Sequence, residues 1–298
     1  MLERTDMQRI VSKDHRNLLA TRLALWGIHL GALAVFLPHM FSWSALAVCV
    51  TLYYLTGAFG ITLCFHRLLT HRSFEIAKPL EYVIAFLGTL ALQGGPIDWI
   101  ATHRAHHANT DRKGDPHDVN QGLIWAHFEW MYRENDARPT RAEQARLAPD
   151  LIGDKYYVFL EQTYVFWQIA LGIALFAIGG WSWVVYGVFL RLVLTYHVTW
   201  LVNSAAHHCG YRSYQTGDKS TNSWWVAFLA WGEGWHNNHH AFPFSARHGF
   251  QWFEFDATWL VIQILAKLRL ASDLKLPTPA MLNRLAIKPA ITQTDVAA

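Results

Sequence analysis

The sequence predicts an all-α integral membrane protein with four transmembrane helices in two hairpins and a helical cap on the cytoplasmic side. Three observations predict this fold class. Only 16% of the 298 residues are charged, whereas soluble domains have roughly 25%. Two long stretches carry almost no charge, and groups of histidines lie at or just beyond the ends of these stretches.

The two hairpins are expected over about residues 23–65 and 157–203. Residues 23–65 contain no Asp, Glu, Lys or Arg, and residues 162–203 contain only Arg191. A membrane-spanning helix needs about 20 apolar residues, so each stretch fits two helices joined by a short turn. The turns are expected at Leu37–Ser42 and Gly179–Ser182. A charge inside a bilayer is a candidate functional residue, but the sequence assigns Arg191 no role.

The distribution of basic residues predicts the orientation. Every Lys and Arg except Arg191 lies outside the two uncharged stretches. The positive-inside rule therefore places both termini and the central charged segment in the cytoplasm. A basic face beside anionic lipid accounts for the net charge of +3, and nothing in the composition favours a nucleic-acid partner.

The remaining segments fit a single domain over residues 1–298. The cap is expected to comprise residues 66–156 and 204–275, followed by a tail over 276–298. Two apolar runs, Leu80–Gln93 and Trp259–Leu270, are too short to span a bilayer and are expected to form core or interfacial helices.

Four groups of residues with nitrogen-rich side chains indicate a metal site. The spacing HxxHH occurs twice, at 103–107 and 236–240, and on a helix it is expected to aim three imidazoles at one point. Asn203 and His207 are four apart. His66 and His71 are five apart, or about 140° around an α-helix, so this pair is expected to straddle a helix end.

These groups together supply nine histidines and one asparagine, more than one ion can bind, so two metal ions are expected. The predicted topology places all four groups at the same membrane boundary. Most histidines outside the groups, including His29, His127 and His248, are expected to be ordinary core or surface residues.

The segments FHRLLTH, HRAHH, NSAAHH and HNNHH, with these separations, resemble the membrane-bound fatty-acyl desaturases. The likeness runs from about residue 20 to 270 and is greatest to the stearoyl-type branch, which inserts a cis double bond at carbon nine. The resemblance implies two iron ions that activate O2. It implies no catalytic residue beyond the metal-binding ones, which are His66, His71, His103, His106, His107, His207, His236, His239 and His240, with Asn203 acting through water.

Metal-binding imidazoles need partners that orient them, and the resemblance implies a substrate tunnel with a bend. Asp115, His117 and Glu233 are candidates for orienting the metal-binding imidazoles. A bent apolar tunnel would select the carbon atoms that react, and the positions that match the bend are Gln93, Trp99 and Thr199.

The chain departs in two ways from features found within the family, and the first concerns the animal acyl-CoA enzymes. Ala101 and Thr102 replace an arginine and an aspartate near the CoA head group, which leaves acyl-lipid, acyl-CoA and acyl-carrier substrates open. Residues 1–298 lack the HPGG haem signature of a fused cytochrome domain, so a separate ferredoxin- or cytochrome-type electron donor is expected. Two alternatives remain: a related membrane di-iron hydroxylase or alkane oxidase, and a His-rich metal transporter.

Overall fold

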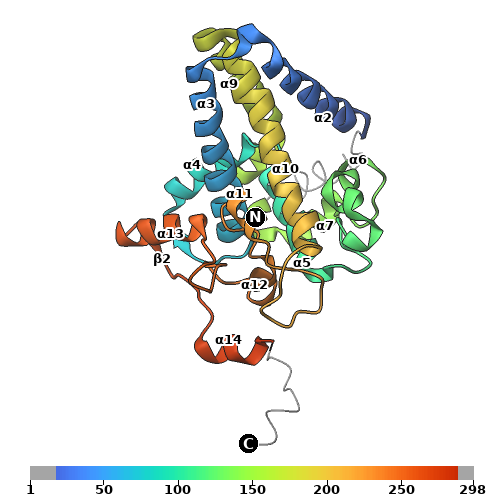
Figure 1. Cartoon of the computed structure of the whole chain (residues 1–298), viewed down its shortest axis with the longest axis vertical. Coiled ribbons are helices and arrows are strands. Elements are labelled where there is room, and N and C mark those ends of the chain that lie inside the picture. Colours follow the sequence, from blue (N-terminus) through green and yellow to red (C-terminus); the bar gives the residue numbers. More distant parts are fainter. Residues whose placement is uncertain (1–17, 288–298) are drawn as a thin grey trace, which may run out of the picture.

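The computed structural model describes residues 18–287, which are mostly helical (Figure 1). In chain order the elements are α2 (Leu18–Ala32), η1 (Leu33–Phe36), η2 (Pro38–Met40), α3 (Trp43–Tyr53), η3 (Tyr54–Thr70), β1 (Glu75–Ile76), α4 (Lys78–Thr89), α5 (Pro96–Asn109), η4 (Val119–Gln121), η5 (Trp125–Glu129), α6 (Trp130–Tyr132), α7 (Arg141–Leu147), α8 (Pro149–Ile152), α9 (Lys155–Val184), η6 (Val185–Leu190), α10 (Arg191–Ser204), η7 (Ala205–His207), α11 (Trp224–Leu229), α12 (His236–Ala241), α13 (Ala257–Lys267), β2 (Ala271–Ser272) and α14 (Pro279–Leu285).

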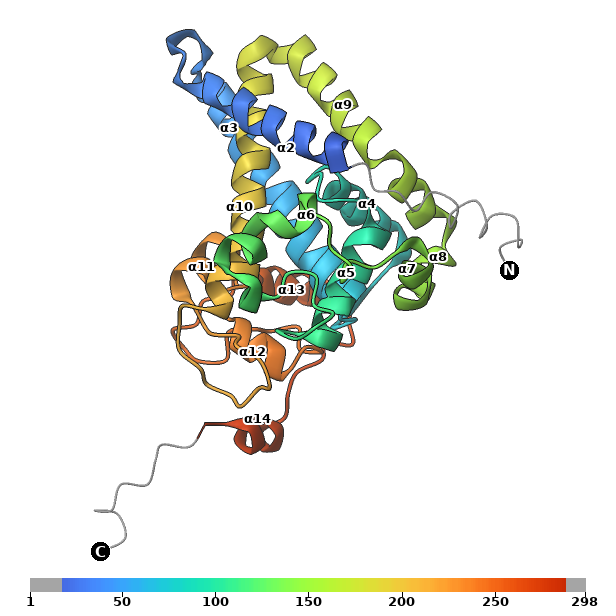
Figure 2. The same cartoon turned by 90° about the vertical axis from the view of Figure 1, so that its right-hand side faces the viewer.

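Three helices in the described part of the chain are long and apolar enough to cross a membrane: Leu18–Phe36, Trp43–Thr70 and Lys155–His207. The third contains a break at Gly180, where φ is 64° and ψ is −159°. Only glycine adopts this conformation at low cost. The break falls within the expected turn Gly179–Ser182, and in Figure 2 the two arms descend from it on either side.

The other expected turn, residues 37–42, also lies at the apex of the molecule. Its last residue, Ser42, begins α3 by accepting a hydrogen bond from the backbone N–H of Ala45 at 3.1 Å. The same hydroxyl lies 3.2 Å from the hydroxyl of Ser182. The two turns are therefore in contact.

The outer surface of the upper helices is apolar. Four large side chains of α2, those of Leu19, Leu23, Trp26 and Leu30, each keep 63–64% of their area exposed. A soluble surface rarely carries so extensive an apolar belt, and lipid is its natural solvent.

The lower body holds the main core, in which η3 packs against α4, α5 and α13. Phe65, Leu69, Ile100 and Leu160 are fully buried within it. The antiparallel pair β1–β2 joins the segment after η3 to the segment after α13. This packing brings the lower ends of η3, α5, α10 and α12 together in the lower half of the molecule, where the predicted histidines lie.

Candidate metal centre

The first histidine pair lies at the end of a π-helix. His66 is in η3, and His71 is the residue that ends it. The N–H of His71 donates to the carbonyl of His66 at 3.1 Å, an i to i+5 bond. This bonding is the π-helical pattern, which brings residues five apart close together on one face. The two rings are 4.8 Å apart, centroid to centroid.

The nine predicted histidines form two groups. In each group the candidate nitrogen atoms all lie within 4.8 Å of one another. The first group contains His66, His71, His103, His107 and His239, and the second contains His106, His207, His236 and His240.

Each HxxHH cluster contributes to both groups, so the expectation that a cluster aims all three rings at one point is wrong. In the cluster on α5, His103 and His107 face the first group and His106 faces the second. The reason is geometric. Residues i and i+4 differ by about 40° around a helix, but i+3 and i+4 differ by about 100°.

In the second group the imidazole protons point away from the centre, which leaves nitrogen lone pairs for a cation. Three of its rings use Nδ1 to donate to carboxylates: His106 to Asp115 (2.9 Å), His207 to Asp111 (3.1 Å) and His240 to Asp218 (3.0 Å). A neutral imidazole has one N–H, so the Nε2 atom of each of these rings carries a lone pair.

These lone pairs converge. His236 Nε2 lies 3.0 Å from His207 Nε2 and 3.1 Å from His240 Nε2, and its single proton could satisfy at most one of them. The buried Nε2 of His106 has no hydrogen-bond partner. Two nitrogens bound at right angles to one ion, with bonds of about 2.1 Å, lie about 3 Å apart. The residues present therefore fit a bound metal.

The first group repeats this spacing. Nε2 of His239 lies 3.1 Å from Nε2 of His66 and 3.0 Å from Nε2 of His107, which is 3.1 Å from Nε2 of His103. Burial, together with the neighbouring imidazoles, holds the pKa of His103, His107 and His239 well below the ordinary value. The rings are therefore neutral, as metal binding requires.

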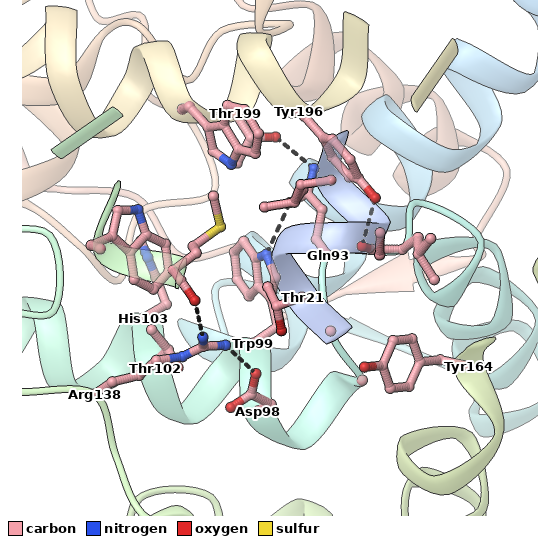
Figure 3. Close-up of a pocket in the computed structure, with 18 of the residues that line it drawn as sticks. Thr21, Gln93, Asp98, Trp99, Thr102, His103, Arg138, Tyr164, Tyr196 and Thr199 are labelled. Carbon is pink, nitrogen blue, oxygen red and sulfur yellow. Dashed lines mark hydrogen bonds and ion pairs between the residues drawn. The ribbon is translucent and has the colours of Figure 1, made fainter. Parts of the chain in front are cut away.

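A cavity of about 560 Å³ reaches the first group at His103 (Figure 3). His103 and Asn203 line its inner wall, and α2 lines another side through Ala24, Leu25 and Ile28. The three predicted bend residues meet in it. Gln93 donates to Thr199 Oγ1 at 2.9 Å and accepts from Trp99 Nε1 at 3.2 Å. The ring of Trp99 stacks on His103, with centroids 5.2 Å apart.

Comparison with known proteins identifies the family. The family model of fatty acid desaturases matches residues 41–271. The chain belongs to the fatty acid desaturase family, and it is therefore an oxidoreductase. The histidine groups and the apolar helices of this desaturase are consistent with metal binding and with a membrane location.

Curated relatives cover most of the chain. The sn-1 stearoyl-lipid 9-desaturase of Anabaena variabilis is 54% identical over 250 residues, which is 84% of this chain and 91% of the relative. The chloroplastic palmitoyl-monogalactosyldiacylglycerol delta-7 desaturase of Arabidopsis thaliana is 48% identical (85% and 68%). The acyl-CoA C20 Delta5-desaturase of Anemone leveillei is 44% identical (89% and 84%).

The three residues predicted to orient the imidazoles of the desaturase all lie against the histidine groups. Asp115 bonds His106, as described above, and accepts from the backbone N–H of His117 at 3.1 Å. The ring of His117 packs 4.2 Å from that of His106. The carboxylate of Glu233 lies 2.7 Å from Nδ1 of His66.

Sequence reasoning missed two carboxylates. Asp111 and Asp218 contact His207 and His240 from loops. Burial alone would raise the pKa of both, but the hydrogen bonds from the histidines outweigh it and hold the pKa below the ordinary value. Asp111 could have been found in the polar stretch NTDRKGDPHD. Asp218 has no comparable signal.

His248 was also missed. It was expected to be an ordinary histidine, but it is fully buried, with Nδ1 3.2 Å from Glu233 and its ring 4.5 Å from that of His239. Arg67 donates to both Glu233 and Asp256 and so holds Glu233 in place between the two histidines. The sequence gives no spacing by which His248 could be distinguished.

Proposed function

We propose that this desaturase uses two iron ions and O2 to introduce a cis double bond into a saturated long-chain acyl group, at carbon nine. The supporting observation is the position of His103, which belongs to the first histidine group and also lines the cavity. An acyl chain in the cavity would therefore lie directly beside the proposed metal site.

The donor set favours iron. The proposed ligands are the nine histidines of the two groups, with Asn203 acting through water. Nitrogen donors suit first-row transition metals. Bound iron with O2 supplies an oxidant able to remove hydrogen from an unactivated methylene, which neither a side-chain base nor redox-inert zinc can do. The overall reaction takes two hydrogens from the chain, two electrons and two protons, and reduces O2 to two waters.

The role of the protein side chains is to place the acyl chain. A saturated chain has many equivalent methylenes, so selectivity must come from position. We propose that Gln93, Trp99 and Thr199 form the bend that sets this position. The neutral, buried hydrogen bonds among them would hold the tryptophan wall still without attracting water. The assignment of carbon nine rests on the stearoyl-lipid relatives.

We propose an acyl-lipid as the substrate. Two arginines near the cavity are each paired with a carboxylate: Arg138 with Asp98 at 2.9 Å and Arg141 with Glu161 at 2.7 Å. CoA carries several phosphates and would favour unpaired cations. The lipid-facing α2 forms one wall, which suits entry from the bilayer. Ala101 and Thr102, at the positions that face CoA in the animal enzymes, agree with this substrate.

The proposed topology has four spans in one domain: α2 with η1, α3 with η3, α9 up to Gly180, and the arm from there through α10. The cap with the metal site, and both termini, would be cytoplasmic; the termini lie outside the described residues. A separate ferredoxin- or cytochrome-type protein would supply electrons.

Expression in a host that lacks its own desaturase tests the proposal. Fatty-acid profiling should reveal a product two hydrogens lighter than its parent, with the double bond at carbon nine. His236→Ala should abolish the product, while a matched His39→Ala change on the exposed apical turn should not. A product heavier by one oxygen would indicate a hydroxylase instead. Metal uptake without any new product would indicate a transporter.

A further inference from the structure

Arg191 is a fully buried charge within an apolar helix. Its side chain has no exposed area, and each of its three hydrogen bonds goes to a neutral oxygen. Nε donates to the carbonyl of Gly187 at 3.1 Å, Nη1 to that of Leu90 at 2.6 Å, and Nη2 to Oε1 of Gln168 at 2.9 Å.

The contact with Leu90 explains how the charge is tolerated. Leu90 is the residue that ends α4. The last carbonyls of a helix have no partner within it and carry the negative end of the helix dipole. A guanidinium at this point satisfies one such carbonyl and compensates the dipole without a carboxylate.

Leu90 also begins the segment that carries Gln93. We call residues 90–93 the bend segment. The backbone of Leu92 is left-handed, with φ 52°, which is unfavourable for a leucine and persists only where neighbours hold it. α10 provides these neighbours: the hydroxyl of Tyr196 donates to the carbonyl of Leu92 at 3.0 Å, and Thr199 accepts from Gln93.

The contacts come from one face of α10. Arg191, Thr195 and Thr199 follow one another at intervals of four residues, and Tyr196 lies beside them. Thr195 Oγ1 donates to the carbonyl of Arg191 at 2.8 Å, and Thr199 Oγ1 to that of Thr195 at 3.0 Å. Figure 3 shows Tyr196, Thr199 and Gln93 at the cavity end of this arrangement.

We propose that Arg191 is a positioning residue that determines where the double bond forms. It does not touch the substrate. It fixes the bend segment at Leu90, so that Gln93, and through it Trp99, hold the acyl chain at one depth relative to the metal site. This inference rests on the proposed function, since it assumes that the cavity binds the acyl chain.

The three bonds of Arg191 explain why arginine is needed. They run to the end of α4, to α9 and to η6, from three nitrogens of one rigid plane. Lysine has a single nitrogen on a flexible chain and cannot hold three such acceptors in fixed directions. Arg191→Lys would keep the charge but release the bend segment.

The test is the position of the double bond in the products of Arg191→Lys and Arg191→Gln, measured by mass spectrometry of derivatised fatty acids. We expect an about tenfold rise in the share of double bonds displaced by one or two carbons, because small misplacements strongly change which atoms react. This readout does not depend on how much enzyme folds. Val226→Ala, which loosens a buried cluster around α11 that contains neither Arg191 nor the bend segment, is the control and should lower the yield without moving the bond.

Unchanged positions in the Arg191 variants would overturn the inference. If both variants form no product, Tyr196→Phe provides the test, because it removes only the hydrogen bond to the carbonyl of Leu92. A displaced double bond in the product of Tyr196→Phe supports the inference, and an unmoved double bond overturns it. If the unmodified protein forms no unsaturated product, the proposed function fails instead, so the two failures are distinguishable.

Discussion

Glu233 lies between two buried histidines, 2.7 Å from Nδ1 of His66 and 3.2 Å from Nδ1 of His248. Arg67 donates to its other oxygen at 3.0 Å. Burial alone would raise the pKa of Glu233, but the cation of Arg67 and the two histidines outweigh it. The carboxylate is therefore ionised, and its negative charge beside Nδ1 favours the form of His66 that carries its proton there, away from the first histidine group.

Glu233→Gln should weaken metal binding at the first group. The neutral amide no longer determines which nitrogen of His66 carries the proton, and changes of this kind usually cost about 10–100-fold in metal affinity. Titration of the metal-free protein against a competing chelator measures the change. Glu143→Gln, at the exposed start of α7, is the control. Equal affinity in both variants would mean that Glu233 does not orient His66.

Asp150 connects two of the histidine segments. It accepts hydrogen bonds from Arg104 at 2.8 and 3.0 Å, and it pairs with Arg72. Arg104 lies next to His103, and Arg72 lies next to His71. Burial opposes ionisation, but the bonds from the two arginines hold the pKa of Asp150 at about 2.

Asp150 should therefore stabilise the protein most above its unfolded pKa. Because the folded pKa is lowered, the contribution is complete above about pH 4 and is lost as the pH falls towards 2. Allowing for partial exposure, we expect Asp150→Asn to cost about 1–2 kcal/mol at pH 7. Unfolding in detergent should show the wild-type and the variant converging between pH 4 and 2. A constant difference over that range would exclude this ion-pair role.

Removal of metal should destabilise the protein. Without a cation, the converging Nε2 lone pairs of His207, His236 and His240 repel one another. A metal at 100 times its dissociation constant contributes about 2.7 kcal/mol per site. Dialysis against a chelator should lower the thermal midpoint, and added Fe²⁺ should restore it. An unchanged midpoint would indicate that the groups hold no stabilising ion.

Two features of the sequence predicted most of the fold and of the candidate site: the uncharged stretches and the repeated HxxHH spacing. The uncharged stretches identified the apolar helices, because a helix that crosses a bilayer needs about 20 apolar residues. The HxxHH spacing identified the histidines that gather at the candidate metal site, because residues three and four apart lie near one another on a helix. The division of each cluster between two groups was not predicted. Whether i+3 joins i and i+4 depends on what the neighbouring helices place beside it, and His106 faces His207 and His240 across the interior.

Contacts between distant segments were the least predictable. His66 and His71 meet because η3 is π-helical. The hydropathy of a segment does not indicate whether its backbone hydrogen bonds span four residues or five. Asp218 reaches His240 from a loop with no periodic pattern. His248 becomes part of the site only because it is buried against Glu233, which Arg67, far away in the sequence, holds in place.

Three imidazoles outside the two groups form a hydrogen-bonded chain. His29 Nδ1 donates to the carbonyl of Leu25 at 2.7 Å, His29 Nε2 lies 3.2 Å from His197 Nε2, and His197 Nδ1 lies 3.0 Å from His127 Nε2. A carbonyl only accepts, so the proton of His29 is on Nδ1. His197 and His127 must then each donate from Nε2.

Ser204 lies at the end of this chain, and the chain has one hydrogen fewer than the number of its hydrogen-bond contacts. Its hydroxyl lies 2.9 Å from His127 Nδ1 and 2.8 Å from the carbonyl of Trp200. Three neutral rings and one hydroxyl supply four hydrogens for five links. Burial lowers the pKa of His127, so a further proton there is disfavoured. One link is therefore unmade, and the hydroxyl is the group able to rotate between two acceptors.

The end and the middle of this hydrogen-bonded chain should consequently respond differently to mutation. Ser204→Ala removes the conflict and leaves three hydrogens for three links, so we expect a change in unfolding free energy below about 0.5 kcal/mol. His197→Phe breaks the middle and leaves buried polar atoms on both sides, which should cost about 1–3 kcal/mol. Thermal unfolding of the two variants in the same detergent measures both. A larger loss for Ser204→Ala than for His197→Phe would show that the hydroxyl, and not the middle ring, holds α2 against α10.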